Sequence, residues 1–314
     1  MLLTVPNVSE GRDHAVIERL AGAFGALLLL DVHSDPDHGR SVLTLAGEQR
    51  EIAEGLLAGA REAVAAIDVS GHPGLHPHVG AIDVAPVVHL GEESRGEAIA
   101  AALTAAALIG DELALPVFLY GALADDRERA EIRVGGIAEL GRRMLSGELV
   151  PDYGPAEPHP TAGALLVTAR PPLVAFNLDL DGDDVELARE IAAGLRESGG
   201  GPPGVRAIGL YLAERGRAQV SFNVHDPQAV PLAELIARVR ERAPVAEAEL
   251  VGLAPRAAFD GFPEDVPLRG FDPERHLIEE ALKSTTGGRR TQSERGQDAR
   301  GSIPSPDGSD QAQA

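Results

Sequence analysis

Hydrophobic and polar positions alternate along this chain in an order that predicts two similar units of mixed α and β structure. In the first unit the spacing of apolar residues changes between that of a strand and that of a helix in the order βαββαβ, followed by one more helix and strand. The expected elements span residues 2–6, 14–24, 26–32, 41–46, 49–67, 82–88, 98–113 and 117–120.

The second unit repeats the order βαββαβ, with elements expected at residues 173–180, 185–196, 205–212, 217–223, 232–242 and 247–253. Two split βαβ units predict an α+β fold with two sandwich subdomains, each a sheet with helices on one face. A ligand is expected in the crevice between them. We place the two subdomains at residues 1–171 and 172–283.

The segment 151–172 joins the two units. It contains six prolines and two glycines, which predicts an extended, ordered loop. Beyond Lys283 the composition changes to Ser, Gly, Gln and charged residues, with almost no large apolar side chain. Residues 284–314 are therefore expected to form a disordered tail.

Composition excludes several classes of function. The chain of 314 residues has no cysteine, which excludes disulfides, thiolate nucleophiles and cysteine metal ligands. Its formal net charge of -21 opposes binding to nucleic acid, and no apolar run is long enough to cross a membrane. The first residues show no secretory signal, so we expect a cytoplasmic protein. An anionic ligand would need a local group of arginines, because Lys283 is the only lysine.

The segment 71–80, GHPGLHPHVG, is the most informative part of the chain. It places three histidines among glycines and prolines, in a loop between a predicted helix and a predicted strand. An imidazole can take a proton from an attacking amine and return it to a leaving amine, and His76 is our candidate for this base. Alternatively, His72, His76 and His78 with Asp83 could bind zinc or another divalent metal.

A second polar loop, residues 31–40, lies between two predicted strands. Arg40 stands at the start of the second strand, where its guanidinium could clamp a substrate carboxylate through two hydrogen bonds. Arg133 and Arg170 are further candidates for the same role. In an acidic protein such arginines are the groups expected to bind an anion.

A third segment, residues 152–163, is rich in proline and glycine. Gly154 and Gly163 lie near its two ends, and His159 and Thr161 supply hydrogen-bonding groups between them. A linker alone would explain the prolines but not both glycines. We therefore interpret this loop as facing a ligand.

In the second unit, Gln219, Ser221 and Asn223 share one face of a predicted strand, because successive side chains of a strand point to opposite faces. If that face lines the crevice, their amide and hydroxyl groups could bind a polar ring edge. Otherwise they form an ordinary solvent-exposed face.

The chain resembles the glutamate formimidoyltransferase family in an ordered series of segments: VPNVSEG at 5–11, HP at 76–77 with GAIDV at 80–84, PDYGP at 151–155, HPTAG at 159–163, LVAFN at 173–177 and AQVS at 218–221. The match extends over about residues 1–282. It is far more specific than any one of these motifs.

The resemblance implies two α+β subdomains with a folate-binding crevice between them, commonly in a homodimer. It places the family's catalytic histidine on His76. The folate-contacting loop falls on residues 154–163 and supplies Gly154, Pro155, His159, Pro160, Thr161, Ala162 and Gly163. We add Gln219 and Asn223 to this set.

The resemblance also implies the reaction. His76 would remove the proton from N5 of tetrahydrofolate as N5 attacks the formimino carbon of formiminoglutamate, and the tetrahedral intermediate would then expel glutamate. Tetrahydrofolate is the co-substrate, and no metal is expected.

The chain departs from the family pattern at two places. Many members read Glu-His-Pro-Arg where this chain has Leu-His-Pro-His at 75–78, and His33 stands where animal members have an acid. The donor could therefore be formylglutamate or another formimino compound. Four residues are assigned to the substrate site: Arg40, His33, His78 and Asp83.

The sequence thus favours a formimidoyltransferase of histidine degradation and one-carbon metabolism, without a cyclodeaminase domain. One alternative is a metal-dependent hydrolase that uses His72, His76 and His78. The other is a non-catalytic protein that binds folate or an amino acid.

Overall fold

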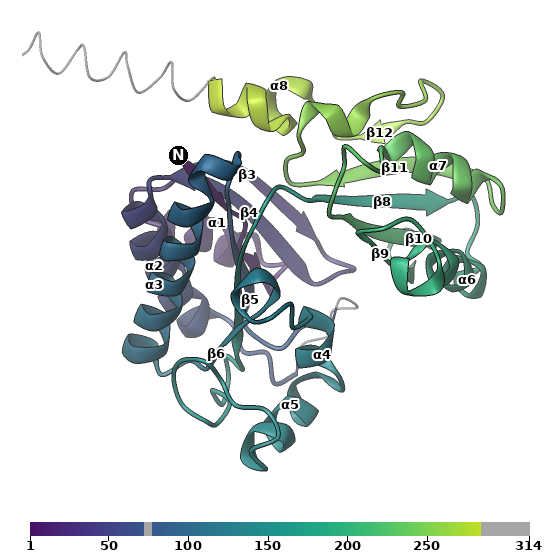
Figure 1. Ribbon diagram of the computed structural model, residues 1–314. Helices are drawn as coiled ribbons and strands as arrows, with labels where there is room; N and C mark the ends of the chain where they lie inside the picture. The colour runs from purple at the N-terminus through teal and green to yellow at the C-terminus, as the bar shows by residue number, and fades with distance from the viewer. Residues whose placement is uncertain (72–76, 284–314) are drawn as a thin grey trace, which may run out of the picture.

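Two β-sheets form the framework of the protein, and the main helices of each unit cover one face of its sheet (Figure 1). The computed structural model describes residues 1–71 and 77–283. Within these residues the larger sheet has seven strands; β1 and β2 lie one after the other between β4 and β5, β3 is outside β4, and β7 and β6 follow β5. The strands are β1 (Leu2–Thr4), β2 (Asn7–Val8), β3 (Leu28–Asp35), β4 (Arg40–Gly47), β5 (Ile82–Val88), β6 (Val117–Leu119) and β7 (Leu165–Arg170).

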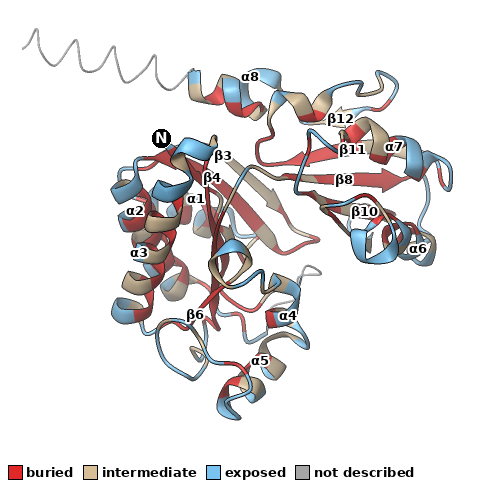
Figure 2. Ribbon diagram, in the orientation of Figure 1, coloured by how far each residue is buried: buried red, intermediate tan, exposed pale blue. Residues whose placement is uncertain are grey.

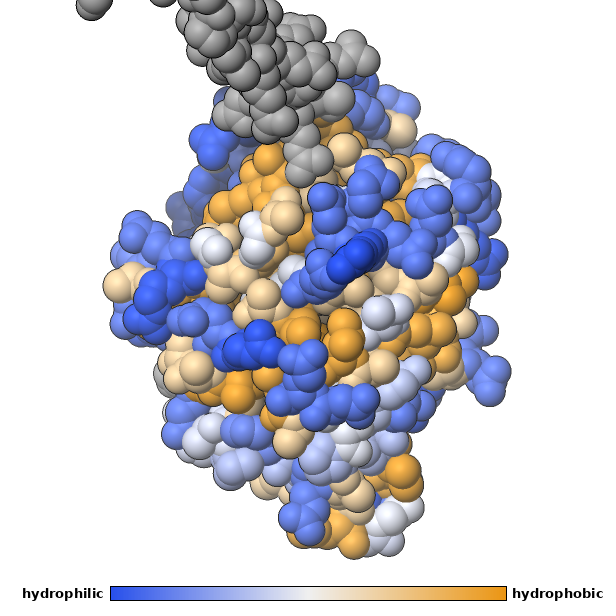
Figure 3. Space-filling view, turned by 90° about the vertical axis from the view of Figure 1, so that its left-hand side faces the viewer, coloured by the Kyte–Doolittle hydropathy of each residue, from blue (hydrophilic) through white to orange (hydrophobic). Residues whose placement is uncertain are grey.

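One face of the larger sheet is covered by α1 (His14–Ala23), α2 (Gln49–Ala66) and α3 (Arg95–Leu113). The Asp13 side chain accepts hydrogen bonds from the backbone N–H groups of Ala15 and Val16 and so begins α1. A capping box between Glu48 and Glu51 begins α2. Figure 3 shows the side of the molecule that carries these helices, where both hydrophilic and hydrophobic residues reach the surface.

The other face of this sheet is partly covered by α4 (Arg129–Arg133) and α5 (Gly136–Leu145). Ile132, Leu140 and Met144 from these helices are buried against Phe118 of β6 and Leu166 of β7. Two short 3-10 helices, η1 (Glu92–Ser94) and η2 (Gly121–Leu123), lie in the same unit. The second unit packs against the rest of this face.

The smaller sheet has five strands within the described residues, in the order β12-β11-β8-β10-β9. These are β8 (Val174–Leu180), β9 (Val205–Leu212), β10 (Arg217–Val224), β11 (Val245–Val251) and β12 (Leu268–Arg269). The helical elements are α6 (Val185–Leu195), η3 (Glu197–Gly199), α7 (Leu232–Arg240), η4 (Arg256–Phe259) and α8 (Pro273–His276). Phe176 and Phe222 on the sheet pack with Ile191 of α6 and Leu235 of α7 to form its core.

The predicted fold class is confirmed, because each unit has the order βαββαβ on its own sheet. One prediction about the connection was wrong. Residues 165–170 were assigned to the loop at 151–172, but they form β7, a buried parallel strand between β5 and β6. Continuous burial of LLVTAR on both faces of the sheet makes it strand, although the prolines and glycines around it suggested a loop. No helix in the described part of the chain is long and apolar enough to span a membrane.

The two sheets meet through the faces that their main helices leave uncovered, and the strands of both are largely buried (Figure 2). At one end of this interface Leu3, Ala46 and Val88 of the larger sheet contact Leu253 and Ile278 of the second unit. At the other end the contact is polar, between the β3–β4 hairpin of the first unit and strands β10 and β11 with the β9–β10 turn of the second. A cavity remains between these two ends.

Candidate functional site

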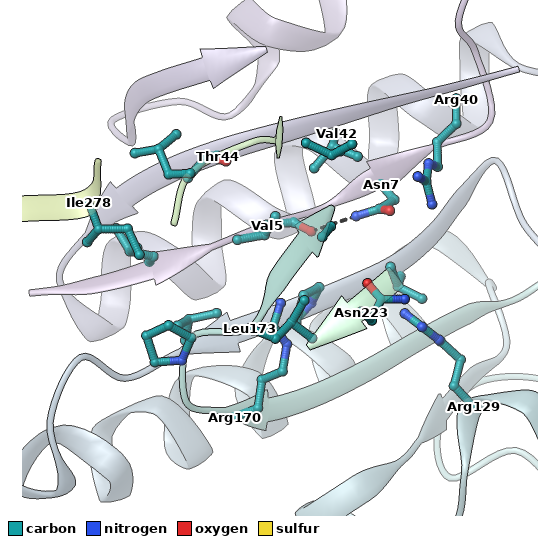
Figure 4. A pocket seen from close by; sticks show the side chains of 18 of the residues that line it. Val5, Asn7, Arg40, Val42, Thr44, Arg129, Arg170, Leu173, Asn223 and Ile278 are labelled. Atoms are coloured by element: carbon teal, nitrogen blue, oxygen red, sulfur yellow. Dashed lines mark hydrogen bonds between the residues drawn. The ribbon is translucent and has the colours of Figure 1, made fainter. Parts of the chain in front are cut away.

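A cavity lies between the two sheets, and part of it is open to solvent. Part of its wall is apolar and includes Leu3, Val88, Leu173, Leu253 and Ile278. The polar part includes Asn7, Arg40, Arg129, Arg170 and Asn223 (Figure 4). Strands of both units supply the lining, so the site exists only when the two units are assembled.

Arg40 is positioned by the tight turn between β3 and β4. Gly39 in this turn has a positive φ of 61°, and Gly11 lies directly against the turn. A Cβ on Gly11 would lie 2.2 Å from the backbone oxygen of Asp35 and 2.6 Å from the backbone nitrogen of Arg40. The VPNVSEG segment therefore holds the start of β4, and with it the Arg40 side chain, at the cavity wall.

Burial, followed by the charges of Arg129 and Arg133, lowers the pKa of Arg40 to about 10. Burial is also the main cause that lowers the pKa of Arg170 to about 10, and the charge of Arg129 acts in the same direction. Both guanidinium groups nevertheless remain protonated at neutral pH. The cavity therefore concentrates positive charge in a protein whose net charge is -21.

Arg40, Arg129 and Arg170 have no carboxylate within ion-pair distance among the described residues, whereas the nearby Arg133 and Arg206 are paired with acids. The side chain of Arg170 donates a hydrogen bond to the backbone oxygen of Pro171. Cations that are crowded and uncompensated destabilise the empty site, and an anionic ligand would offset this cost. The arrangement fits an anion-binding cavity.

Asp83 and Arg133 form a buried ion pair beside the cavity, with side chains 3% and 8% exposed. The Asp83 carboxylate also accepts a hydrogen bond of 2.8 Å from the backbone N–H of Val79. It thereby fixes the point at which the histidine loop enters β5. Asp83 was predicted to contact substrate, and in the structure both of its oxygens already have protein partners.

The predicted base, His76, lies outside the described residues, as does His72. His78 is described and half-buried, directly before Val79. In the described part of the chain no group of three His, Asp or Glu residues could hold a metal ion. The metal alternative depends on His72 and His76, so this observation leaves it untested.

The exit of the histidine loop is tied to two other segments. Ser9 donates a hydrogen bond of 2.8 Å from its hydroxyl to the Gly80 oxygen, and the N–H of Ala81 donates to the Ala162 oxygen. The N–H of Val69 donates to the oxygen of Thr161 on the other side of the loop. Three segments of the family resemblance therefore lie side by side.

The predicted folate loop ends in a closed turn. The backbones of His159 and Gly163 exchange two hydrogen bonds, and His159 Nδ1 accepts a third from the N–H of Ala162. Gly154 and Gly163 both have positive φ, and a Cβ on either would lie within 2.6 Å of a backbone oxygen, at Leu115 and Val79 respectively. The positive φ and the close backbone contacts therefore explain why both positions are glycine, without a ligand.

This loop lies beside the histidine loop and does not line the cavity. Pro155, Pro160 and Thr161 are exposed. If the loop contacts a ligand, that ligand must extend out of the cavity, past Val79 and Gly80.

The polar face of β10 points toward the first unit. Asn223 lines the cavity, and Arg129 is directed towards it (Figure 4). Gln219 is fully buried elsewhere in the interface, where its amide nitrogen donates to Asp179 at 2.7 Å and its oxygen lies 3.0 Å from His38 Nε2. The structure thus brings Asn223 to the cavity and uses Gln219 to join the two units.

His33 also belongs to the polar interface and not to the cavity wall. Its Nε2 lies 3.6 Å from a Glu249 oxygen. Burial lowers the pKa of His33, although the nearby acids oppose this shift. Glu249 also forms ion pairs with Arg215 and Arg269.

Arg129 is a cavity residue that the sequence did not single out. It is one of several charged residues in the segment DDRERAEIR, and nothing in its neighbours distinguishes it from a solvent-exposed helical arginine. Arg129 lines the cavity only because α4 packs beside it.

Comparison with known proteins assigns most of the chain to one family. Residues 1–170 match the model of the formiminotransferase domain, N-terminal subdomain, and residues 175–260 match that of the formiminotransferase domain. The chain is 37% identical over 290 residues to the glutamate formimidoyltransferase of Streptococcus pyogenes, an alignment that covers 88% of this chain and 97% of that protein.

Two further relatives are also formimidoyltransferases by name. The glutamate formimidoyltransferase of Thermoplasma acidophilum is 31% identical, with 89% of this chain and 96% of that protein covered. The formimidoyltransferase-cyclodeaminase of Mus musculus is 38% identical over 81% of this chain, which spans about half (50%) of the mouse protein. The chain belongs to the formiminotransferase family.

Proposed function

We propose that this transferase is a glutamate formimidoyltransferase, which moves the formimino group of N-formimino-L-glutamate to N5 of tetrahydrofolate. The observation that carries the proposal beyond family membership is the cavity with three arginines that lack carboxylate partners in the described chain. Both substrates are dicarboxylates. An acidic protein that binds them needs such a local group of cations.

The cavity also suits the rest of the acceptor. Its apolar wall, with Leu3, Val88 and Leu253, can pack against the aromatic part of a folate, and the polar groups of Asn7 and Asn223 remain for its heteroatoms. We assign Arg40 to a carboxylate of the donor. It lies at the end of the cavity nearest the histidine loop, because His78 precedes β5 and Arg40 begins β4, and these strands run in the same direction.

The chemical step is a transfer between two nitrogens. We assign His76 as the base that takes the proton from N5 of tetrahydrofolate as N5 attacks the formimino carbon. The resulting tetrahedral intermediate collapses when the carbon–nitrogen bond to glutamate breaks, and the proton returns to the leaving amine. The Asp83–Arg133 pair supports this step indirectly, because it anchors Val79 at the end of the loop that carries His76.

We further propose that residues 154–163 contact the folate, that no metal takes part, and that the protein works in the cytoplasm as a homodimer. Histidine degradation, which releases formiminoglutamate, would supply the donor. These assignments rest on the family resemblance.

The direct experiment supplies formiminoglutamate and tetrahydrofolate to purified protein and follows the appearance of glutamate and 5-formiminotetrahydrofolate. Turnover that is unaffected by EDTA is expected, and a tightly bound stoichiometric metal that is needed for activity would contradict the mechanism. His76→Ala should lower turnover by on the order of a hundredfold or more, with little change in folate binding. His14→Ala, at an exposed position on α1, is the control.

A further inference from the structure

The cavity between the two sheets is too small, in the present arrangement of the two units, to enclose either proposed substrate. Its interior volume is about 70 Å3, which is room for a handful of water molecules. A site that encloses a drug-sized ligand usually has about 300–1,000 Å3. The two units must therefore move apart before a ligand can reach the residues that line the cavity.

Two sides of the cavity are held together by buried contacts between the units. At the apolar end, Leu253 and Ile278 of the second unit pack with Leu3 of the first. At the β3–β4 hairpin, His38 lies 3.0 Å from Gln219, and both side chains are buried. Opening either side would expose apolar surface or leave buried polar groups without partners.

The side between α4 and β9 is held much more weakly. Glu128, directly before α4, pairs with Arg206 of β9 at 2.6 Å, and the two side chains are 48% and 40% exposed. Among the described residues, this is the only ion pair or hydrogen bond that joins residues 120–136 to the second unit. An exposed ion pair contributes little to stability. The units can therefore separate most easily on this side.

This ion pair stands directly at the edge of the cavity. Arg206 pairs in register with Asn223, which lines the cavity. Arg129, the residue after Glu128, also lines it, and its side chain is directed towards Asn223 (Figure 4). Because β9 is an edge strand of the second sheet, no further strand of the described chain lies outside it. A gap between α4 and β9 would thus lead from solvent to the cavity.

Both partners of the ion pair have a stable place when the pair is broken. Arg206 also pairs with Glu197 of the second unit at 2.6 Å, so its charge would stay compensated. Glu128 is exposed enough to be hydrated. The rest of α4 is fixed to the first unit, because Ile132 is fully buried there and Arg133 pairs with Asp83.

We propose that the space between α4 and β9 is the gate through which ligands enter and leave the cavity, and that the Glu128–Arg206 ion pair is its latch. The apolar end and the β3–β4 hairpin stay packed while the gate opens. The use of folate as the probe ligand rests on the proposed function, whereas the gate itself does not.

The first test locks the gate with a cross-link. Because the chain has no cysteine, Glu128→Cys with Arg206→Cys introduces the only two thiols, which a short bis-maleimide can join. Labelled folate bound before cross-linking is then chased with unlabelled folate. The short cross-link should slow the release of folate by about tenfold or more, because release then requires the gate to open. When it is made before folate is added, it should slow uptake to a similar extent.

Two controls separate closure from chemical modification and from general stiffening. A bis-maleimide with a long flexible spacer, on the same two cysteines, should leave exchange near that of the protein without a cross-link. A short cross-link between Arg12→Cys and Glu214→Cys should also leave it unchanged, because that exposed pair joins the units beside the β3–β4 hairpin. Unchanged exchange with the short cross-link at 128 and 206 would overturn the gate, as would equal slowing by either control.

The second test needs no ligand. Spin labels on Glu131→Cys and Ser198→Cys, both at exposed positions, measure the separation of α4 and the second unit. Adding Glu128→Gln should increase the population at the longer distance by about two- to fivefold, the factor expected for an exposed ion pair. Arg12→Gln should leave the distances unchanged. Distances that do not respond to Glu128→Gln would refute the latch. A protein that opens in this way but does not bind folate would keep the gate and refute the proposed function.

Discussion

His38 Nε2 lies 3.0 Å from Gln219 Oε1, and this contact joins the β3–β4 turn of the first unit to β10, an interior strand of the second sheet. The two residues are 181 positions apart in the chain. Gln219 in turn donates to Asp179, which also pairs with Arg215 and Arg269. A buried polar network therefore sets how the two units sit against each other, and so the width of the cavity.

Gln219→Ala should destabilise the protein more than it weakens ligand binding. Removal of the amide takes away a buried hydrogen-bond partner on both sides of the interface, with an expected loss of about 1–3 kcal/mol in the free energy of unfolding. Urea denaturation measures this loss. Ser221→Ala, two residues along the same face of β10, is the matched control. If Gln219→Ala left stability intact but reduced folate affinity, the side chain would instead contact the ligand.

Asp83 and Arg133 should show strong energetic coupling. Either Asp83→Asn or Arg133→Gln breaks a buried ion pair and leaves the partner charge uncompensated, so each should lower the free energy of unfolding by about 3–5 kcal/mol. The double variant should lose clearly less free energy of unfolding than the sum of the losses in the two single variants. A double-mutant cycle from denaturant unfolding tests this, and additive losses would show that the pair contributes little.

Arg40→Gln should raise KM for formiminoglutamate by about tenfold or more, since a charge-assisted carboxylate contact is lost. KM for tetrahydrofolate should stay near that of the parent. Initial-rate kinetics with each substrate varied in turn separate the two constants. An effect confined to tetrahydrofolate would place the donor elsewhere in the cavity.

Glu249 should make the interface sensitive to acid. Burial alone would raise the pKa of Glu249, but the His33 ring, the Arg269 guanidinium and the Asn177 amide outweigh it and hold the pKa below its ordinary value. The unfolded chain then binds a proton at a higher pH than the folded protein does, so stability falls as the pH drops through the carboxyl range.

The measurement for this prediction is the free energy of unfolding of wild type and Glu249→Gln at several pH values from 7 to about 4. The wild type should be the more stable of the two at pH 7, and the difference should shrink toward the acid end. A difference that does not depend on pH would exclude the titration of Glu249 as its cause.

The family motifs and the two βαββαβ patterns could be read from the sequence, because they depend on local periodicity and short ordered segments. The strand β7 could not. Its run LLVTAR has no alternation, since a central parallel strand is buried on both faces, and it stands between proline-rich stretches that suggest a loop.

The chain itself therefore determined the fold class, the family and the choice of Arg40 and Asn223 as candidates, since each rests on residue type and spacing. The tertiary structure decided which polar groups remain open to a ligand. Gln219 and Asn223 look alike on one strand, yet the first is occupied by His38 and Asp179 and the second faces the cavity. Arg129 likewise reaches the cavity only because of the way in which α4 packs. The physical reason is that a side chain's role depends on which partners reach it, and these partners come from distant parts of the chain.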